Sequence, residues 1–448
     1  MSRILIDLTD LQLWSGNHGG TQRVVYGIAK EFYLEQIQPL ATDKVIFIAF
    51  SENEKRFYET SFQPIYDRVE AAHLQLSRPN TTAVISRKTQ LKQMLRPYIP
   101  ASIRQNEKAK RMAYKSLVLS KSKIVRARSF IKSKALTKVT IVSAGKLVDF
   151  KSDDNILMLG KPWDNLDIQS HLTAERSRLG FRLIQIVYDL IICLNPQLHH
   201  PSLFQQYTQH MFEAASASDI MLPISESSKR DLKLFCDRLN IPMPATQVLR
   251  LGDELESEKS RHTTKPDERI AASFVACIGT IEIRKNHSLL YSVYKLAAER
   301  NVELPQLVIV GSRGWLSGDL QYLIEHDPAM KEKILILDNV NDNGLAWVYQ
   351  NCDYTVYPSM YEGWGLPVAE SLAYGKVCLA SNSSSVPEIA GELLDYFSPY
   401  NPEECLSVMV GYIQDPSLLE SKQKRIVRQY QTTSWQQTYQ QVRKSISK

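Results

Sequence analysis

The sequence has no long hydrophobic run. No stretch of its 448 residues approaches the ~18 consecutive apolar residues that a membrane-spanning helix needs. The first ten residues do not have the pattern of a signal peptide, because Asp7 and Asp10 interrupt the apolar positions. Hydrophobic residues make up 44% and charged residues 23%, which is ordinary for a globular protein. We therefore expect a cytoplasmic protein.

Cysteine pairs and two common ligand motifs are also missing. The six cysteines are scattered and form no Cys-x-x-Cys pair, so we predict reduced core thiols and neither a disulfide framework nor a zinc site. There is no Gly-x-Gly-x-x-Gly spacing for a dinucleotide and no convincing Asp-x-Asp motif for a metal. We therefore expect no cofactor and no metal. The cysteines are Cys193, Cys236, Cys277, Cys352, Cys378 and Cys405.

The chain is long enough for two domains, each with its own core. Residues 254–270 are polar and charged, so we interpret them as a linker between a first domain, 1–253, and a second, 271–430. Strands and helices alternate through the second domain, which predicts a doubly wound parallel sheet of α/β class. The tail, 431–448, reads as a polar helix.

Positive charge is concentrated in one segment. Residues 104–138, within an insertion near 96–140, contain twelve Lys or Arg and one acid, a net charge of +11. The whole chain carries +6, so the remainder sums to −5. Placed on a helix, the segment has an apolar stripe from Tyr114 to Ala135, which is typical of a helix on an anionic membrane surface. A solvated insertion, or a contact with an anionic glycan or nucleic acid, fits the same charge pattern.

The most informative stretch follows an apolar strand, 354–357, and leads into a helix near 368–374. Gly363 and Gly365 allow the backbone to approach a bound group closely. Glu362 lies in the loop and Glu370 about a turn into the helix. Two such carboxylates suit a polyhydroxylated ligand, because each accepts hydrogen bonds from neighbouring hydroxyls.

A second motif opens the second domain. The apolar run 271–278 predicts a strand buried on both faces, and Gly279 follows it directly. Arg284 and Lys285 come next, before a helix. Two fixed cations at this position suit a diphosphate, whose charge grows as a nucleoside diphosphate departs.

The first domain offers weaker signals. A strand over 4–8 is followed by a loop with Gly19 and Gly20 and then by a helix over 21–33, an arrangement that presents backbone N–H groups to an anion. Asp189 directly follows a strand over 183–188, and ligands bind open α/β sheets at that end of a strand.

Glu362 and Glu370 around Gly-Trp-Gly-Leu-Pro resemble the paired-glutamate motif of the retaining nucleotide-sugar glycosyltransferases of family 4. The resemblance covers roughly residues 271–402. It implies the GT-B architecture, in which two Rossmann-like domains face a cleft, with the last helix packing back on the first domain. It also implies transfer of a hexosyl group from a nucleoside diphosphate sugar to a hydroxyl of a glycan or lipid-linked oligosaccharide. Retention through a front-face mechanism is the family expectation.

The resemblance also assigns roles to residues. Glu362 would hold the transferring sugar and Glu370 the ribose. The remaining donor-site positions are Gly279, Arg284 and Lys285 at the diphosphate, Val340 at the nucleobase, and Gly363, Gly365 and Leu366 in the loop before the helix. Gly19 and Gly20 would lie beside the diphosphate and the acceptor, with His18 and Arg23 lining the same region.

The resemblance does not settle which residue contacts the acceptor hydroxyl or which sugar is transferred. Asp189 is the candidate for the acceptor hydroxyl or for the architecture of the cleft, although Tyr188 stands where the family often has His. Val310 to Trp315 is similar to enzymes that build mannose- or rhamnose-containing bacterial surface polysaccharides, so a mannosyl or rhamnosyl donor is favoured.

Three alternatives remain at this stage. The first is a non-catalytic sugar- or nucleotide-binding protein of the same fold, which the presence of both glutamates argues against. The second is a nucleic-acid-binding protein that uses 104–138, although the chain has no strand motif of the RNA-binding type. The third is a sugar epimerase or phosphorylase of the same architecture, which product analysis would separate.

Overall fold

The computed structural model describes residues 3–12, 14, 20–38, 43–76, 145–253 and 263–447. His18, Gly19, the basic segment 104–138 and the linker residues 254–262 lie outside the described residues. Within the described part of the chain, no helix is long and apolar enough to cross a membrane. All six cysteines are free thiols, and five of them are buried, as predicted.

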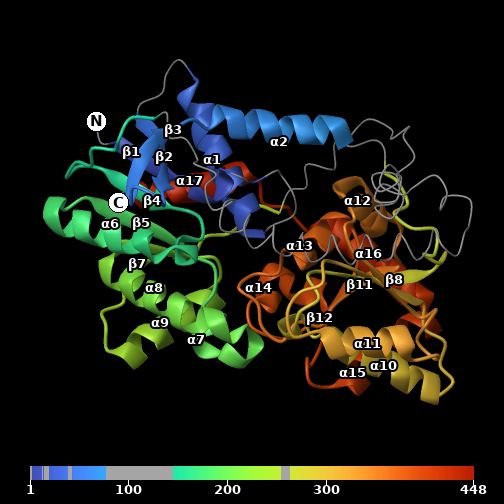
Figure 1. Cartoon of the computed structure of the whole chain (residues 1–448). Coiled ribbons are helices and arrows are strands. Elements are labelled where there is room, and N and C mark those ends of the chain that lie inside the picture. Colours follow the sequence, from blue (N-terminus) through green and yellow to red (C-terminus); the bar gives the residue numbers. More distant parts are fainter. Residues whose placement is uncertain are drawn as a thin grey trace, which may run out of the picture. The chain divides into compact units, whose positions relative to one another are not determined.

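The first domain contains a seven-stranded sheet (Figure 1) in the order β3-β2-β1-β4-β5-β6-β7. All neighbours are parallel except β2 and β3, which pair antiparallel. The edge strand β3 lies in the region after residue 52, where the family pattern is hard to recognise in the sequence. The strands are β1 (Arg3–Asp7), β2 (Lys44–Ser51), β3 (Arg56–Thr60), β4 (Asn155–Met158), β5 (Arg182–Val187), β6 (Ile220–Pro223) and β7 (Ala245–Thr246).

Helices with one apolar face cover this sheet. The predicted first helix buries Val24, Val25, Ile28 and Phe32, which recur at helical spacing. Helix α9 (Glu226–Leu239) begins directly after Ser225, whose side chain accepts a hydrogen bond from the Ser228 N–H and caps the helix. The described helices are α1 (Gly20–Gln36), α2 (Gln63–Leu76), α6 (Leu166–Leu179), α7 (Ile191–Leu194), α8 (Phe204–Ala217) and α9 (Glu226–Leu239).

The second domain contains a six-stranded, fully parallel sheet in the order β10-β9-β8-β11-β12-β13, so the predicted doubly wound sheet is confirmed. Its strands are β8 (Phe274–Ile278), β9 (Gln306–Val310), β10 (Ile334–Leu337), β11 (Tyr354–Tyr357), β12 (Cys378–Ser381) and β13 (Asp395–Phe397). Its helices are α10 (His287–Glu299), α11 (Gly318–His326), α12 (Asp342–Asn351), α13 (Leu366–Ala373), α14 (Val386–Ala390), α15 (Pro402–Gln414) and α16 (Pro416–Gln429).

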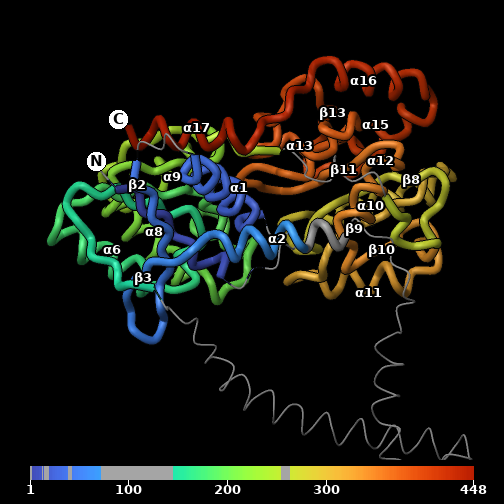
Figure 2. The backbone as a smooth tube through the Cα atoms, turned by 90° about the horizontal axis from the view of Figure 1, so that it is seen from above, coloured from blue at the N-terminus to red at the C-terminus, as the bar shows by residue number. Residues whose placement is uncertain are grey.

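The last helix, α17 (Trp435–Ile446), lies beside α1 of the first domain (Figures 1 and 2). Two glycines make room for its first residue. A Cβ at Gly27 would lie 2.3 Å from the Trp435 ring, and a Cβ at Gly252 would lie 2.6 Å from it. The ring of Tyr439 then packs edge-on against Phe32, with their centroids 4.7 Å apart. The end of the chain is thus fixed to the first domain by aromatic packing.

Candidate active site

The candidate site lies where two neighbouring strands of the second sheet end. Strands β8 and β11 are adjacent and parallel, so their carboxyl ends meet at one edge of the sheet. A short 3₁₀ turn, Ile283–Lys285, follows β8 and carries both predicted cations. The loop after β11 carries Glu362 and leads into α13. The fold therefore brings together three residues that the sequence predicted for one site.

Glu362 is the centre of this cluster and is almost fully buried. One carboxylate oxygen accepts a hydrogen bond from Arg284 Nη1 at 2.5 Å, and the other accepts one from Lys285 Nζ at 2.6 Å. Burial by itself would raise the pKa of Glu362, but the charges of Arg284 and Lys285 outweigh it and lower the pKa to about 2. The hydroxyls of Ser359 and Tyr357 also donate to this carboxylate, at 2.6 and 2.8 Å. Glu362 is therefore ionised and held in one orientation.

The two cations are balanced by acids of their own domain. Arg284 also binds the buried Glu282 at 2.8 Å, and its backbone oxygen accepts the Met360 N–H at 2.9 Å. Burial lowers the pKa of Lys285, and Glu362 only partly reverses that effect. The two cations and two carboxylates of this cluster sum to zero charge. A ligand phosphate would therefore bind here by replacing part of the contacts that Glu362 now makes.

Two of the predicted glycines are required by close approach and by backbone geometry. A Cβ at Gly363 would lie 2.2 Å from the backbone oxygen of Tyr188, so the Glu362 loop packs directly on the loop after β5 of the first domain. Gly365 has φ +117°, which other residues rarely adopt, and it starts α13. Gly279, at the end of β8, lies beside the Lys285 side chain.

Asp189 lies near this cluster, as the sequence predicted from its position after a strand. Burial raises its pKa, while the nearby Arg284 acts in the opposite direction. Its carboxylate accepts the N–H of Ile191, the first residue of α7, at 3.1 Å. Asp189 thus holds the backbone at the start of α7 and lies beside the Glu362 cluster.

Glu370 lies in α13 and has different partners from Glu362. Its Oε1 accepts a hydrogen bond from Arg23 Nη1 at 2.6 Å, and its Oε2 accepts one from the Tyr349 hydroxyl at 2.8 Å. Arg23 belongs to α1 of the first domain, so this contact joins the two domains. Gly20, at the start of α1, faces Leu366 at the start of α13. The structure therefore brings these predicted residues to the N-terminal turns of α1 and α13.

Val340 follows β10 and is half-buried. Its side chain packs against the core of the second domain and against Gly344, where an added Cβ would lie 2.9 Å from Val340 Cγ1. The structure gives it this packing role and leaves its predicted role at the nucleobase untested.

A run of serines, not predicted from the sequence as part of the site, holds the Glu362 loop. Ser381 and Ser383 donate hydrogen bonds to the backbone oxygens of Ser359 and Met360, at 2.6 and 2.5 Å. The Glu362 N–H donates to Ser384 Oγ at 2.7 Å. Ser385 donates to the backbone oxygens of Glu362 and Trp364, at 2.9 and 2.8 Å. Serines gathered directly after a strand are a signal for such side chain–backbone contacts.

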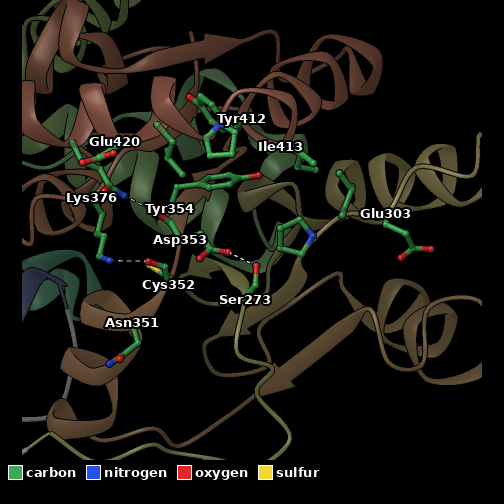
Figure 3. Close-up of a pocket in the computed structure, with 15 residues that line it drawn as sticks. Ser273, Glu303, Asn351, Cys352, Asp353, Tyr354, Lys376, Tyr412, Ile413 and Glu420 are labelled. Carbon is green, nitrogen blue, oxygen red and sulfur yellow. Dashed lines mark hydrogen bonds between the residues drawn. The ribbon is translucent and has the colours of Figure 1, made fainter.

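A surface hollow of about 690 Å³ lies elsewhere in the second domain (Figure 3). Ser273, Pro305, Asp353 and Lys376 line it, and each directly or nearly precedes a strand of the sheet. Figure 3 shows the hydrogen bond that Ser273 donates to Asp353 and the one that Lys376 donates to the backbone oxygen of Cys352. The hollow is therefore at the amino ends of the strands, opposite the edge that carries Glu362.

Comparisons with known proteins agree with this geometry. Residues 258–428 match the family described as Glycosyl transferases group 1. The chain is 25% identical over 270 residues to the O-antigen chain mannosyltransferase B of Escherichia coli, an alignment that covers 57% of this chain and 67% of that protein. It is 25% identical over 279 residues to the serotype-specific mannosyltransferase WbdA of Escherichia coli, covering 60% of this chain but only 33% of WbdA.

A solved structure is similar over the whole length. The E. coli structure described as trehalose-6-phosphate bound with UDP-2-fluoro glucose superposes with a TM-score of 0.57 at 11% identity, covering 100% of this chain and 99% of that chain. This likeness concerns the fold, which is GT-B with two Rossmann-like α/β domains. The chain thus has the GT-B fold and a C-terminal domain that matches the Glycosyl transferases group 1 family, and these findings support a glycosyltransferase enzyme.

Proposed function

We propose that this protein transfers a hexosyl group from a nucleoside diphosphate sugar to a hydroxyl of a glycan or lipid-linked oligosaccharide during surface polysaccharide synthesis. The observation that carries this proposal is the cluster of Glu362, Arg284 and Lys285 at the carboxyl ends of β8 and β11. Mannosyltransferase relatives of O-antigen synthesis support a surface glycan as product and favour a mannosyl donor. A neighbour of the same fold holds a UDP-sugar analogue, which supports a nucleoside diphosphate sugar as donor.

The roles follow from the charges of the cluster. Arg284 and Lys285 receive the diphosphate and stabilise the charge that develops on the leaving nucleoside diphosphate, aided by the N-terminus of α13. Glu362, ionised and fixed, accepts hydrogen bonds from hydroxyls of the transferring sugar. In this proposal no metal ion is needed, because Arg284 and Lys285 pair with the diphosphate in place of part of their contacts with Glu362.

The proposal includes retention of the anomeric configuration. Glu362 is held by four side-chain donors, so its role is to bind hydroxyls and not to act as a covalent nucleophile. A front-face reaction would then place the acceptor hydroxyl on the same side as the departing diphosphate. Burial raises the pKa of Asp189, and the charge of the nearby Arg284 lowers it. Asp189 is the candidate proton acceptor for the acceptor hydroxyl.

Donor consumption tests this function directly. Purified protein is incubated with GDP-mannose, UDP-glucose and dTDP-rhamnose, with and without a lipid-linked acceptor, and nucleoside diphosphate release is measured. We expect release from at least one donor, faster with acceptor, and an α-configured product by NMR from an α-linked donor. A product of inverted configuration would contradict retention. Absence of release from every donor would contradict the proposed function.

We also propose that the protein associates with the inner membrane surface through residues 104–138, on the charge pattern of that segment alone. Sedimentation with anionic and neutral vesicles tests this. Binding should occur on anionic vesicles only, fall with salt, and weaken when Lys121, Lys123, Arg126 and Arg128 are replaced by Gln. Equal partitioning of wild type and this variant onto the vesicles would contradict the proposed membrane association.

A further inference from the structure

The hollow shown in Figure 3 is large enough for a small ligand. Its volume of about 690 Å³ falls within the roughly 300–1,000 Å³ that ligand pockets usually have. It lies at the amino ends of the strands of the second sheet, whereas Arg284, Lys285 and Glu362 lie at their carboxyl ends. A ligand in this hollow would therefore leave the proposed donor site free.

Three polar side chains of the hollow are held against two consecutive backbone positions. Lys376 Nζ donates a hydrogen bond to the backbone oxygen of Cys352 at 2.7 Å, and Gln423 Nε2 donates one to the backbone oxygen of Asp353 at 2.9 Å. Asp353 Oδ2 accepts the hydroxyl of Ser273 at 2.6 Å. This part of the hollow thus presents donors and acceptors together, in fixed positions.

These side chains keep hydrogen-bonding capacity that a ligand can use. An ammonium group has three N–H donors, and a carboxylate has about two lone pairs on each oxygen. Among the described residues, Lys376 forms no ion pair and Asp353 Oδ1 receives no hydrogen bond. The buried hydroxyl of Tyr354 also has no partner in this part of the chain. Ligand hydroxyls can donate to Asp353 and accept from Lys376, which is the pairing that a polyhydroxylated molecule offers.

Another part of the lining is apolar. Pro416 and Leu419 lie on the face of α16 that also carries Glu420 and Gln423, because positions three, four and seven apart share one side of a helix. Ile413, near the end of α15, adds a third apolar side chain. A pyranose ring has C–H groups on its faces and hydroxyls on its rim, so it can meet both kinds of surface at once.

The charges around the hollow disfavour an anionic ligand. Its lining contains the carboxylates of Glu303, Asp353 and Glu420 and the single ammonium group of Lys376. Two of these carboxylates pair with surface lysines outside the lining. The hollow thus has no excess of positive charge for a nucleotide or a phosphate, and a neutral ligand fits it better.

We propose that this hollow is a second saccharide-binding site, which holds neutral sugar residues of the glycan while the end of that glycan is extended at the Glu362 cluster. The inference rests on the proposed function, in which the product is a glycan. A second contact makes the binding of the acceptor end partly intramolecular and raises its effective concentration. Only acceptors long enough to reach both places gain this advantage.

Binding of α-linked mannotetraose tests the inference, because curated relatives of the chain are mannosyltransferases. Saturation-transfer NMR titrations in excess GDP measure its affinity for wild type, Lys376→Met and Asp353→Asn. Wild type should bind the tetrasaccharide, and GDP should not displace it. Each variant should weaken binding about tenfold or more, as expected for a lost hydrogen bond to a charged group.

A matched control separates loss of the site from general damage. Lys422 also belongs to α16, keeps 33% of its side-chain surface, pairs with Asp395 and does not line the hollow. Lys422→Met should bind mannotetraose as wild type does. In transfer assays, Lys376→Met should use methyl α-mannoside as wild type does but should lose the advantage of mannotetraose as acceptor. A saccharide bound only at the Glu362 cluster would keep its affinity in Lys376→Met.

The outcomes distinguish this inference from the proposed function. If wild type does not bind mannotetraose, or if Lys376→Met and Asp353→Asn bind it as tightly as wild type, the hollow is not a saccharide site, even when the protein consumes a donor. If wild type consumes no donor, the proposed function fails. Binding of mannotetraose that both variants weaken would still assign the hollow to a saccharide.

Discussion

At the scale of single residues, the carboxylate of Glu362 has two tasks that conflict. It neutralises Arg284 and Lys285 in the free protein, and it is proposed to bind sugar hydroxyls when the donor is present. Removing one partner of a buried ion pair leaves an uncompensated charge, which typically costs about 3 kcal/mol or more. The free enzyme is therefore stabilised by the same group that turnover requires.

This conflict predicts the behaviour of Glu362→Gln. The variant should lose about 3 kcal/mol of unfolding free energy in urea, because Arg284 then keeps Glu282 as its acidic partner while Lys285 keeps the neutral Tyr357 hydroxyl. It should also lose most turnover. A nucleoside diphosphate should raise its melting temperature more than that of wild type, since the diphosphate replaces the missing charge.

The exposed Glu392→Gln serves as the control, because its side chain keeps 94% of its surface. That variant should change stability by less than about 0.5 kcal/mol. A Glu362→Gln variant as stable and as active as wild type would remove Glu362 from both tasks.

At the scale of elements, α8 carries a buried histidine that the proposed chemistry does not use. His210 packs near Trp163 and Tyr207, with ring centroids 5.9 and 6.5 Å away, and its Nδ1 has no hydrogen-bond partner among the described residues. Burial disfavours the imidazolium and lowers the pKa of His210 to about 4. The unfolded chain takes up this proton near pH 6.5, so it binds more protons than the folded protein between pH 6.5 and 4. Through this group, stability is lost as the pH falls across that window.

We therefore predict that His210→Phe reduces the acid sensitivity of the protein. Phe keeps the aromatic packing, removes the unpaired nitrogen and does not titrate. The variant should be at least as stable as wild type at pH 7 and should lose less unfolding free energy between pH 7 and 5. Urea unfolding at pH 7, 6 and 5 gives the slope of unfolding free energy against pH for wild type and for His210→Phe. The other titrating groups are common to these two proteins. Identical slopes would show that His210 is not buried in its neutral form.

The strands β8 and β11 are the elements that made the position of the site predictable from the sequence. The strand before Arg284 and the strand before Glu362 are continuous apolar runs, and adjacent parallel strands bring their carboxyl ends together. Those residues could therefore be predicted to meet. Ser381 and Ser383–Ser385 could not be assigned to the Glu362 loop. A run of serines does not indicate which backbone groups its hydroxyls will hydrogen-bond. The Arg23–Glu370 pair spans 347 positions and depends on how the two domains dock, which no local pattern encodes.

At the scale of the whole molecule, the chain returns from the second domain to the first through α17. Alternating strands and helices predict two α/β domains. The antiparallel strand β3 and the helix α2 were not predicted, because they lie in the region after residue 52, where the family pattern is hard to recognise. The close approach of Trp435 to Gly27 and Gly252 shows why glycine occurs inside α1. Tertiary packing outweighs helix propensity at this position.

This packing predicts opposite effects of the same substitution at two glycines. Gly27→Ala should destabilise the protein by about 1–3 kcal/mol, although Ala favours a helix, because the new Cβ would lie 2.3 Å from the Trp435 ring. Gly411→Ala, inside α15, meets nothing within 4 Å and should stabilise by about 0.5–1 kcal/mol. Urea unfolding measures both. A Gly27→Ala variant that is more stable than wild type would show that α17 does not pack on α1.

The most direct measurement of the central claim is the affinity of Arg284→Ala and Lys285→Ala for nucleoside diphosphates, determined by calorimetry against wild type. Wild type should bind at least one of UDP, GDP, ADP and dTDP. Each variant should weaken that binding by roughly 1.5–3 kcal/mol, the contribution of a hydrogen bond to a charged group. Arg300→Ala should have no effect, because Arg300 pairs with Glu403 on the surface of α10 and α15. Unchanged affinity in both Arg284→Ala and Lys285→Ala would contradict the assignment of this cluster to the donor diphosphate.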